Sequence, residues 1–104
     1  MRTYIPKNYG ISKDRYLELR AFCLQYDEYN QAKYTQLKAQ AEQKIARIEE
    51  TALQAVDNSE PLFRCLMENV THEKAFNNME CPCSRGTFYK LRKRFFALLD
   101  LNEA

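Results

Sequence analysis

The sequence predicts an all-α fold, a small helical bundle of four to five helices that ends in a helix-turn-helix. A chain of 104 residues suffices for one hydrophobic core but not for two, so residues 1–104 are expected to form a single domain. Glycine and proline are scarce, with 2 and 3 occurrences, which favours helices over hairpins. Apolar residues also recur at intervals of three or four, as they do on one face of an α-helix.

The chain opens with an N-terminal arm. Pro6 and Gly10 disfavour a helix within residues 1–11, so this segment is expected to be extended and to end in a turn. Ser12 then offers a side-chain oxygen that can cap the first amides of a helix. The first helix is therefore predicted from Lys13 to Tyr26.

Residues 12–56 are expected to form a helical hairpin. The apolar period lapses in the polar, tyrosine-rich stretch Tyr26–Asn30, so the break between the two helices is predicted there. A second helix of about 25 residues should follow and end near Val56. Its apolar positions form one narrow stripe, which suits either a hairpin or the seam of a homodimer through Leu37, Ile45 and Ile48. The stripe consists of Tyr34, Leu37, Ala41, Ile45, Ile48, Ala52 and Val56.

Residues 59–104 carry the predicted helix-turn-helix. A third helix should run over Glu60–Asn69, with the apolar side of that helix buried. Thr71 is expected to cap a short fourth helix that ends at Asn78. The proline-containing connector Met79–Cys83 follows, and Ser84 caps a long last helix from Arg85 to about Leu101.

The last predicted helix has two chemically different faces. Between Cys81 and Leu99 the chain has five basic residues and no acidic residue, although the formal net charge of the whole chain is only +2. One arc of this helix is apolar and is expected to face the core. The arc consists of Phe88, Leu91, Phe95, Leu98 and Leu99. The positive charge is therefore local and lies on the outward side of one helix.

A short helix, a tight turn and a capped basic helix together match a helix-turn-helix, whose second helix enters the major groove of DNA. Arg85, at the helix start, can reach a guanine edge, and the hydroxyl group of Thr87 or Tyr89 can bond a phosphate. Lys90, Lys93 and Arg94, further along the helix, can neutralise flanking phosphates. Gly86 leaves room for another backbone to approach. The predicted nucleic-acid-binding residues are Arg85, Thr87, Tyr89, Lys90, Lys93 and Arg94.

The stretch from Cys83 to Phe96, CSRGTFYKLRKRFF, resembles the C-terminal end of small proteins from phages and mobile elements of Firmicutes. It is also similar to the sigma-region-4-like helix-turn-helix of the ArpU and RinA families of phage late-gene regulators. The opening from Tyr4–Lys7 through Tyr16–Arg20 resembles the start of the same small proteins. The resemblance implies a DNA-binding transcriptional regulator with double-stranded DNA as its partner. Residues 27–56 match no sigma-like pattern.

Other interpretations of the basic helix stay open. Its cations are also compatible with an ordinary solvated face, or with a surface that binds RNA or an acidic protein. A function of a different class is a small protein inhibitor of a host or defence complex, comparable to an anti-CRISPR protein. Such an inhibitor would use residues 27–56. Separately, Tyr26, Tyr29 and Tyr34 could form a partner-binding patch, because tyrosine is enriched at protein interfaces.

The cysteine pattern argues weakly for a metal site. Cys81 and Cys83 are separated by one residue, and Cys65, Cys23 and His72 are the candidates that would complete a zinc site. Zinc sites usually contain pairs of cysteines spaced by two or more residues, so we expect no metal and no cofactor. A single histidine and two glycines also provide no nucleophile–base pair and no phosphate-binding loop, so no enzymatic activity is expected.

No stretch of about 18 consecutive apolar residues is available to span a membrane. The N-terminal residues also lack the apolar core of a secretory signal. The sequence therefore predicts a cytoplasmic protein that does not contact membranes and whose 4 cysteines are reduced.

Overall fold

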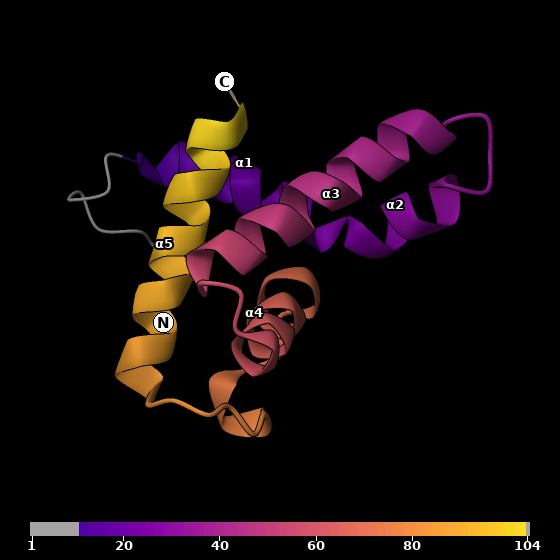
Figure 1. Ribbon diagram of the computed structural model, residues 1–104. Helices are drawn as coiled ribbons and strands as arrows, with labels where there is room; N and C mark the ends of the chain where they lie inside the picture. The colour runs from indigo at the N-terminus through magenta and orange to yellow at the C-terminus, as the bar shows by residue number, and fades with distance from the viewer. Residues whose placement is uncertain (1–10, 104) are drawn as a thin grey trace.

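A computed structural model describes residues 11–103 (Figure 1). All regular structure in that part of the chain is helical, so the predicted all-α fold is confirmed. The predicted N-terminal arm lies outside the described residues except for Ile11, which is buried in the core. The elements of this part are α1 (Lys13–Leu24), α2 (Tyr26–Ala32), α3 (Lys38–Ala55), α4 (Glu60–His72), the 3-10 turn η2 (Phe76–Asn78) and α5 (Arg85–Glu103).

The first helix starts where the sequence predicts. The Ser12 side chain accepts a 3.1 Å hydrogen bond from the backbone N–H of Arg15, which is the geometry of an N-cap. The helix ends at Leu24, slightly earlier than the expected Tyr26, because Gln25 leaves the helical conformation and bonds back to the last turn of α1. One side of α1 enters the core through Tyr16, Leu19 and Cys23.

The predicted break over Tyr26–Asn30 is wrong, because this stretch forms α2. Asp27 and Glu28 place negative charge in the first turn of α2, where it stabilises the exposed amides. Tyr29 is buried against the core and holds the helix in place. The chain reverses only over residues 33–37, beyond the tyrosine-rich stretch.

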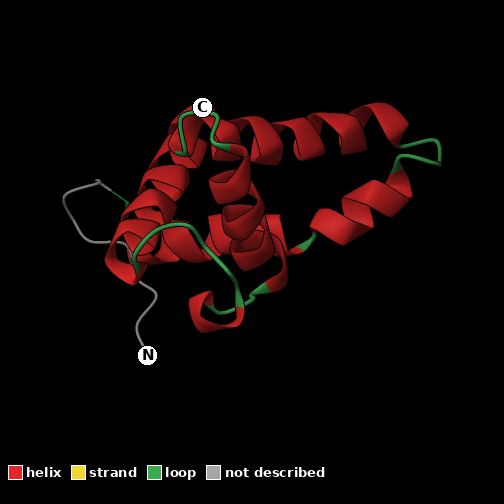
Figure 2. Cartoon of the chain, turned by 60° about the horizontal axis from the view of Figure 1, so that its bottom comes forward, coloured by secondary structure: helices red, strands yellow, loops and turns green. Residues whose placement is uncertain are grey.

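The turn end of the α2–α3 hairpin projects from the rest of the molecule, whereas the later part of α3 packs against α5 and α4 (Figures 1 and 2). Most of the predicted apolar stripe of α3 is buried, including Val56 just after the helix. Tyr34 and Leu37 are exceptions, with exposed fractions of 84% and 56%. They lie in the turn before α3, so the helical period that predicted their burial does not apply to them. Ile45 and Ile48, from the predicted dimer seam, are buried within the single chain.

The predicted end of the third helix and the predicted fourth helix are both wrong. Thr71 does not cap a helix over Thr71–Asn78; it lies inside α4, where its hydroxyl donates a 2.5 Å hydrogen bond to the carbonyl oxygen of Met67. The helix ends only after His72, because Glu73 adopts a left-handed conformation with φ of 57°. What remains of the expected short helix is the 3-10 turn η2.

The last helix runs at an angle to α3, packs against it and also contacts α1 and α4 (Figure 1). Phe88, Phe95 and Leu99 are fully buried, as predicted. Phe96 is also fully buried and packs edge-on against Tyr16, with 5.0 Å between the ring centroids. The helices of residues 11–103 include none that is both long and apolar enough to cross a membrane.

Candidate nucleic-acid interface

The start of α5 is fixed by a side-chain cap. The backbone N–H of Thr87 donates a 3.2 Å hydrogen bond to the Ser84 hydroxyl oxygen, so the predicted cap is confirmed. The Ser84 hydroxyl in turn donates to the Thr87 hydroxyl at 3.0 Å. Thr87 is therefore part of the cap, although its side chain remains exposed.

Four of the predicted contact residues are cations on the outer side of α5. Arg85, Lys90 and Arg94 are exposed, and Lys93 is half-buried. Arg94 lies 3.5 Å from a carboxylate oxygen of Asp57, which is itself exposed. The other three form no ion pair with a carboxylate of residues 11–103. The positive charge of α5 is thus mostly not neutralised by this part of the protein.

Tyr89 supports the first of these cations. The guanidinium carbon of Arg85 lies 5.8 Å from the centre of the Tyr89 ring, within the range of a cation–π contact. The Tyr89 ring packs edge-on against Phe88, with 5.4 Å between centroids. Because Phe88 is buried, this chain of contacts holds Arg85 over the outer surface of the helix.

Gly86 lies in open surroundings. A Cβ atom built at this position would meet no described heavy atom within 4 Å, so the fold does not need a glycine there for internal packing. The first turn of α5 therefore presents an uncovered backbone beside Arg85, with the N–H groups of a helix start nearby.

Sequence reasoning missed the role of Arg92, which it counted only among the five basic residues between Cys81 and Leu99. Arg92 is only 8% exposed, and its Nε donates a 2.7 Å hydrogen bond to the side-chain oxygen of Asn69. Its position four residues after Phe88 and four before Phe96 is a signal that could have placed it on the buried arc. It is therefore not part of the cationic surface.

The segment before α5 differs from the predicted helix-turn-helix. Residues 73–84 separate α4 from α5, and they contain only the 3-10 turn in place of a short helix. Phe76 anchors this turn by packing on Phe88, with 5.4 Å between ring centroids. The α-helix that precedes α5 in the chain is thus α4.

The five candidate zinc ligands are not brought together. Cys23 is buried in the core, and His72 faces Asp27, with 2.9 Å between its Nε2 and the carboxylate. No group of three or more histidine, cysteine or carboxylate residues within the described part of the chain is placed to hold a metal ion. Cys65, Cys81 and Cys83 nevertheless lie close to one another beside α4.

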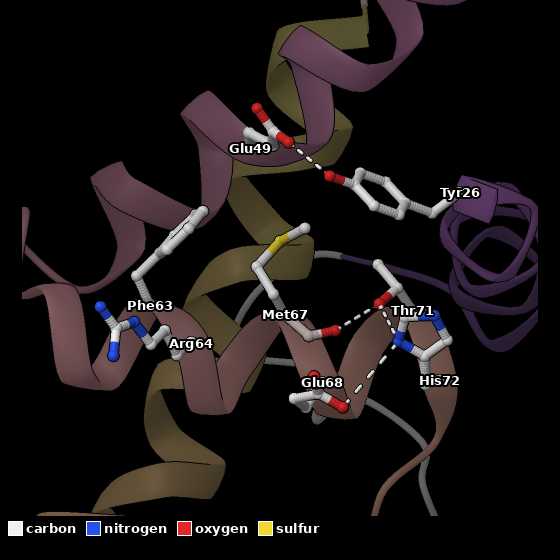
Figure 3. A pocket seen from close by; sticks show the side chains of 8 residues that line it. All are labelled: Tyr26, Glu49, Phe63, Arg64, Met67, Glu68, Thr71 and His72. Carbon is white, nitrogen blue, oxygen red and sulfur yellow. Dashed lines mark hydrogen bonds and ion pairs between the residues drawn. The ribbon is translucent and has the colours of Figure 1, made fainter. Parts of the chain in front are cut away.

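A separate hollow of about 280 Å³ lies between α2, α3 and α4 (Figure 3). Several of its polar groups contact one another: the Tyr26 hydroxyl donates to the Glu49 carboxylate, and the Thr71 hydroxyl lies 3.0 Å from Nδ1 of His72. Burial is the main cause that raises the pKa of Tyr26, and the hydrogen bond to Glu49 adds to it. The hollow is lined by Tyr26, Glu49, Phe63, Arg64, Met67, Glu68, Thr71 and His72.

The cationic side of α5 is therefore the candidate site that the structure offers for a macromolecular partner. Comparisons of the chain with protein-family models, with curated proteins and with solved structures yield no match.

Proposed function

We propose that the protein binds double-stranded DNA through the outward side of α5 and acts as a transcriptional regulator of phage or mobile-element genes. The observation that carries this proposal is the absence of ion pairs between Arg85, Lys90 or Lys93 and any carboxylate of residues 11–103. No acidic residue occurs between Cys81 and Leu99. A row of cations without internal counter-charges attracts a polyanion.

The packing of α5 supports the same proposal. Phe88, Phe95 and Leu99 fix one side of the helix in the core, so its opposite side faces outward without any rearrangement. The open backbone at Gly86 lets a phosphate approach the first amides of the helix. The start of the helix would then supply backbone contacts, and the cations along it would neutralise further phosphates.

The proposal has a quantitative consequence for salt dependence. If the four cations of α5 each neutralise one phosphate, the logarithm of the association constant should fall against the logarithm of salt concentration with a slope of about −3.6. If these cations only form a solvated surface that does not bind DNA, the protein would show no measurable affinity for the duplex.

Fluorescence anisotropy with a labelled random duplex, between 50 and 200 mM salt, tests the proposal. Arg85→Ala and Lys90→Ala should each weaken binding about fivefold and make the slope less steep by about one unit. Lys38→Ala is the matched control, because Lys38 is an exposed cation on α3 and should leave the affinity unchanged. No duplex binding at low salt, or equal affinity of all the variants, contradicts the proposal.

A second candidate function is the inhibition of a host or defence complex by protein–protein binding. The observation in its favour is the exposure of Tyr34 and Leu37 at the end of the projecting hairpin. The broader tyrosine patch does not form, because Tyr29 is buried and the Tyr26 hydroxyl is bonded to Glu49. A partner that co-purifies with the native chain but not with a Tyr34→Ser, Leu37→Ser variant, together with no duplex binding, would favour this function.

A further inference from the structure

Three of the 4 cysteines gather where the connector before α5 meets α4. The sulfur atoms of Cys81 and Cys83 lie 3.6 Å apart. The Cys65 thiol, from α4, donates a weak hydrogen bond to the carbonyl oxygen of Glu80 at 3.8 Å. Burial, followed by the neighbouring Cys65 and Cys83 thiols, raises the pKa of Cys81. Cys81 is thus the central thiol of the cluster.

Small reagents can reach this cluster from solvent. Cys81 and Cys83 are both partly exposed. A hollow of about 300 Å³, whose lining includes Cys65, Lys74 and Glu80, opens beside it. The remaining cysteine, Cys23, has no exposed surface.

We propose that Cys81 and Cys83 form a reversible intramolecular disulfide that controls the start of α5. The two sulfur atoms must close from 3.6 Å to a bonded distance of about 2.05 Å. Residues two apart in an extended segment point to the same side, and the bend at Pro82 and Cys83 brings the side chains closer. Cys83 directly precedes Ser84, so ring closure acts on the cap of α5.

The oxidant is a low-molecular-weight disulfide such as oxidised glutathione. The Cys83 thiolate attacks one reagent sulfur, the reagent S–S bond breaks, and a mixed disulfide forms while the first reagent thiolate leaves and takes up a proton. Cys81 then loses its proton and attacks the Cys83 sulfur, which releases the second reagent thiol. Two electrons pass from the protein to the reagent, so one reagent disulfide yields two thiols.

The functional consequence rests on the proposed DNA binding. Ser84 caps α5 through Thr87, and Arg85 is the first cation of the contact face. A covalent ring that ends one residue before the cap changes the backbone path into α5. The oxidised protein is therefore expected to bind duplex DNA at least about threefold more weakly, with full recovery after reduction.

The experiment treats the folded full-length chain with oxidised glutathione, alkylates the free thiols and maps tryptic peptides by mass spectrometry. Cys81 and Cys83 fall in one tryptic peptide, residues 75–85, whereas Cys65 and Cys23 fall in two others. The expected product is peptide 75–85 without any alkyl group and about 2 Da lighter than the same peptide with two free thiols, with no cross-linked peptides. Cys83→Ser should abolish this product, and Cys23→Ser, the matched control, should retain it.

The affinity for duplex DNA is then measured on the same oxidised and reduced samples. This measurement distinguishes a failure of the proposed disulfide from a failure of the proposed DNA binding. A Cys65 cross-link, a persistent mixed disulfide or a doubly alkylated peptide 75–85 overturns the disulfide assignment, whatever the DNA affinity. If the reduced and oxidised samples bind duplex DNA with equal affinity, the disulfide does not control the start of α5. If neither sample binds duplex while peptide 75–85 loses about 2 Da, the proposed DNA binding fails and the disulfide stands.

Discussion

A terminal nitrogen of the Arg92 guanidinium donates a 2.9 Å hydrogen bond to the Tyr16 hydroxyl, across 76 positions of the chain. Its Nε bonds Asn69, and the Phe96 ring lies 5.0 Å from the guanidinium carbon. Arg92 forms no ion pair with a carboxylate in residues 11–103, so neutral oxygens and aromatic faces hold this buried cation. The contacts join α1, α4 and α5 and orient the cationic face outward.

Replacing Tyr16 by Phe should therefore destabilise the protein by about 1–3 kcal/mol, because a buried donor of Arg92 loses its acceptor. Urea denaturation gives the free energy of unfolding. Tyr34→Phe is the matched control, since Tyr34 is 84% exposed and its hydroxyl should contribute less than about 0.5 kcal/mol. In the Tyr16→Phe, Arg92→Met double variant the loss should be smaller than the sum of the two single losses. Strict additivity would show that the two side chains are not coupled.

Two aliphatic residues in and just before α3 provide a test of the hairpin. Ile48 is fully buried, so Ile48→Ala should cost about 2–5 kcal/mol through lost burial and a cavity. Leu37 is 56% exposed, and Leu37→Ala should change the free energy of unfolding by less than about 0.5 kcal/mol. Thermal and urea unfolding measure both. A large loss for Leu37→Ala would mean that the hairpin end is covered in solution, as a dimer through this end would require.

Stability should fall in alkaline solution because a buried thiol must stay protonated. Burial raises the pKa of Cys23 from 9.0 to about 12, so the stabilisation is complete below pH 9 and is lost as the pH rises towards 12. The expected slope from this thiol is about 1.4 kcal/mol per pH unit. Tyr26 and Tyr29, whose pKa values burial also raises, add losses in the same direction above pH 10. Cys23→Ala should make the fall in stability between pH 9 and 10 less steep, with the raised pKa of Cys81 leaving a residual slope; an unchanged slope would contradict this account.

Gly86→Ala should separate stability from binding. The new Cβ meets no described atom within 4 Å, so the variant should gain up to about 1 kcal/mol from the better helix former. If a phosphate approaches this backbone, the same methyl group should weaken duplex binding at least about fivefold. Thermal melting and fluorescence anisotropy measure the two effects. A stabilised variant with native affinity would place the DNA contact away from the helix start.

Helix starts were predictable where one side chain provides the signal. Ser12 and Ser84 both cap helices as expected, since a hydroxyl placed before an apolar period acts locally on the nearby amides. Thr71 was misassigned by the same rule, because its hydroxyl bonds the preceding turn of α4 and the helix continues past it. A threonine can act in either way, and packing around α4 decides between them.

The sequence by itself determined that the chain is helical, that α5 buries Phe88 and Phe95 and that its outward side is cationic, because these properties follow from composition and from the 3.6-residue period. Tertiary structure decided where the hairpin turns, which cation enters the core and which thiols meet. Arg92 is buried because Tyr16 and Asn69, from two other helices, supply its hydrogen bonds. Partners that distant in the chain leave no periodic signal, so only the folded arrangement specifies them.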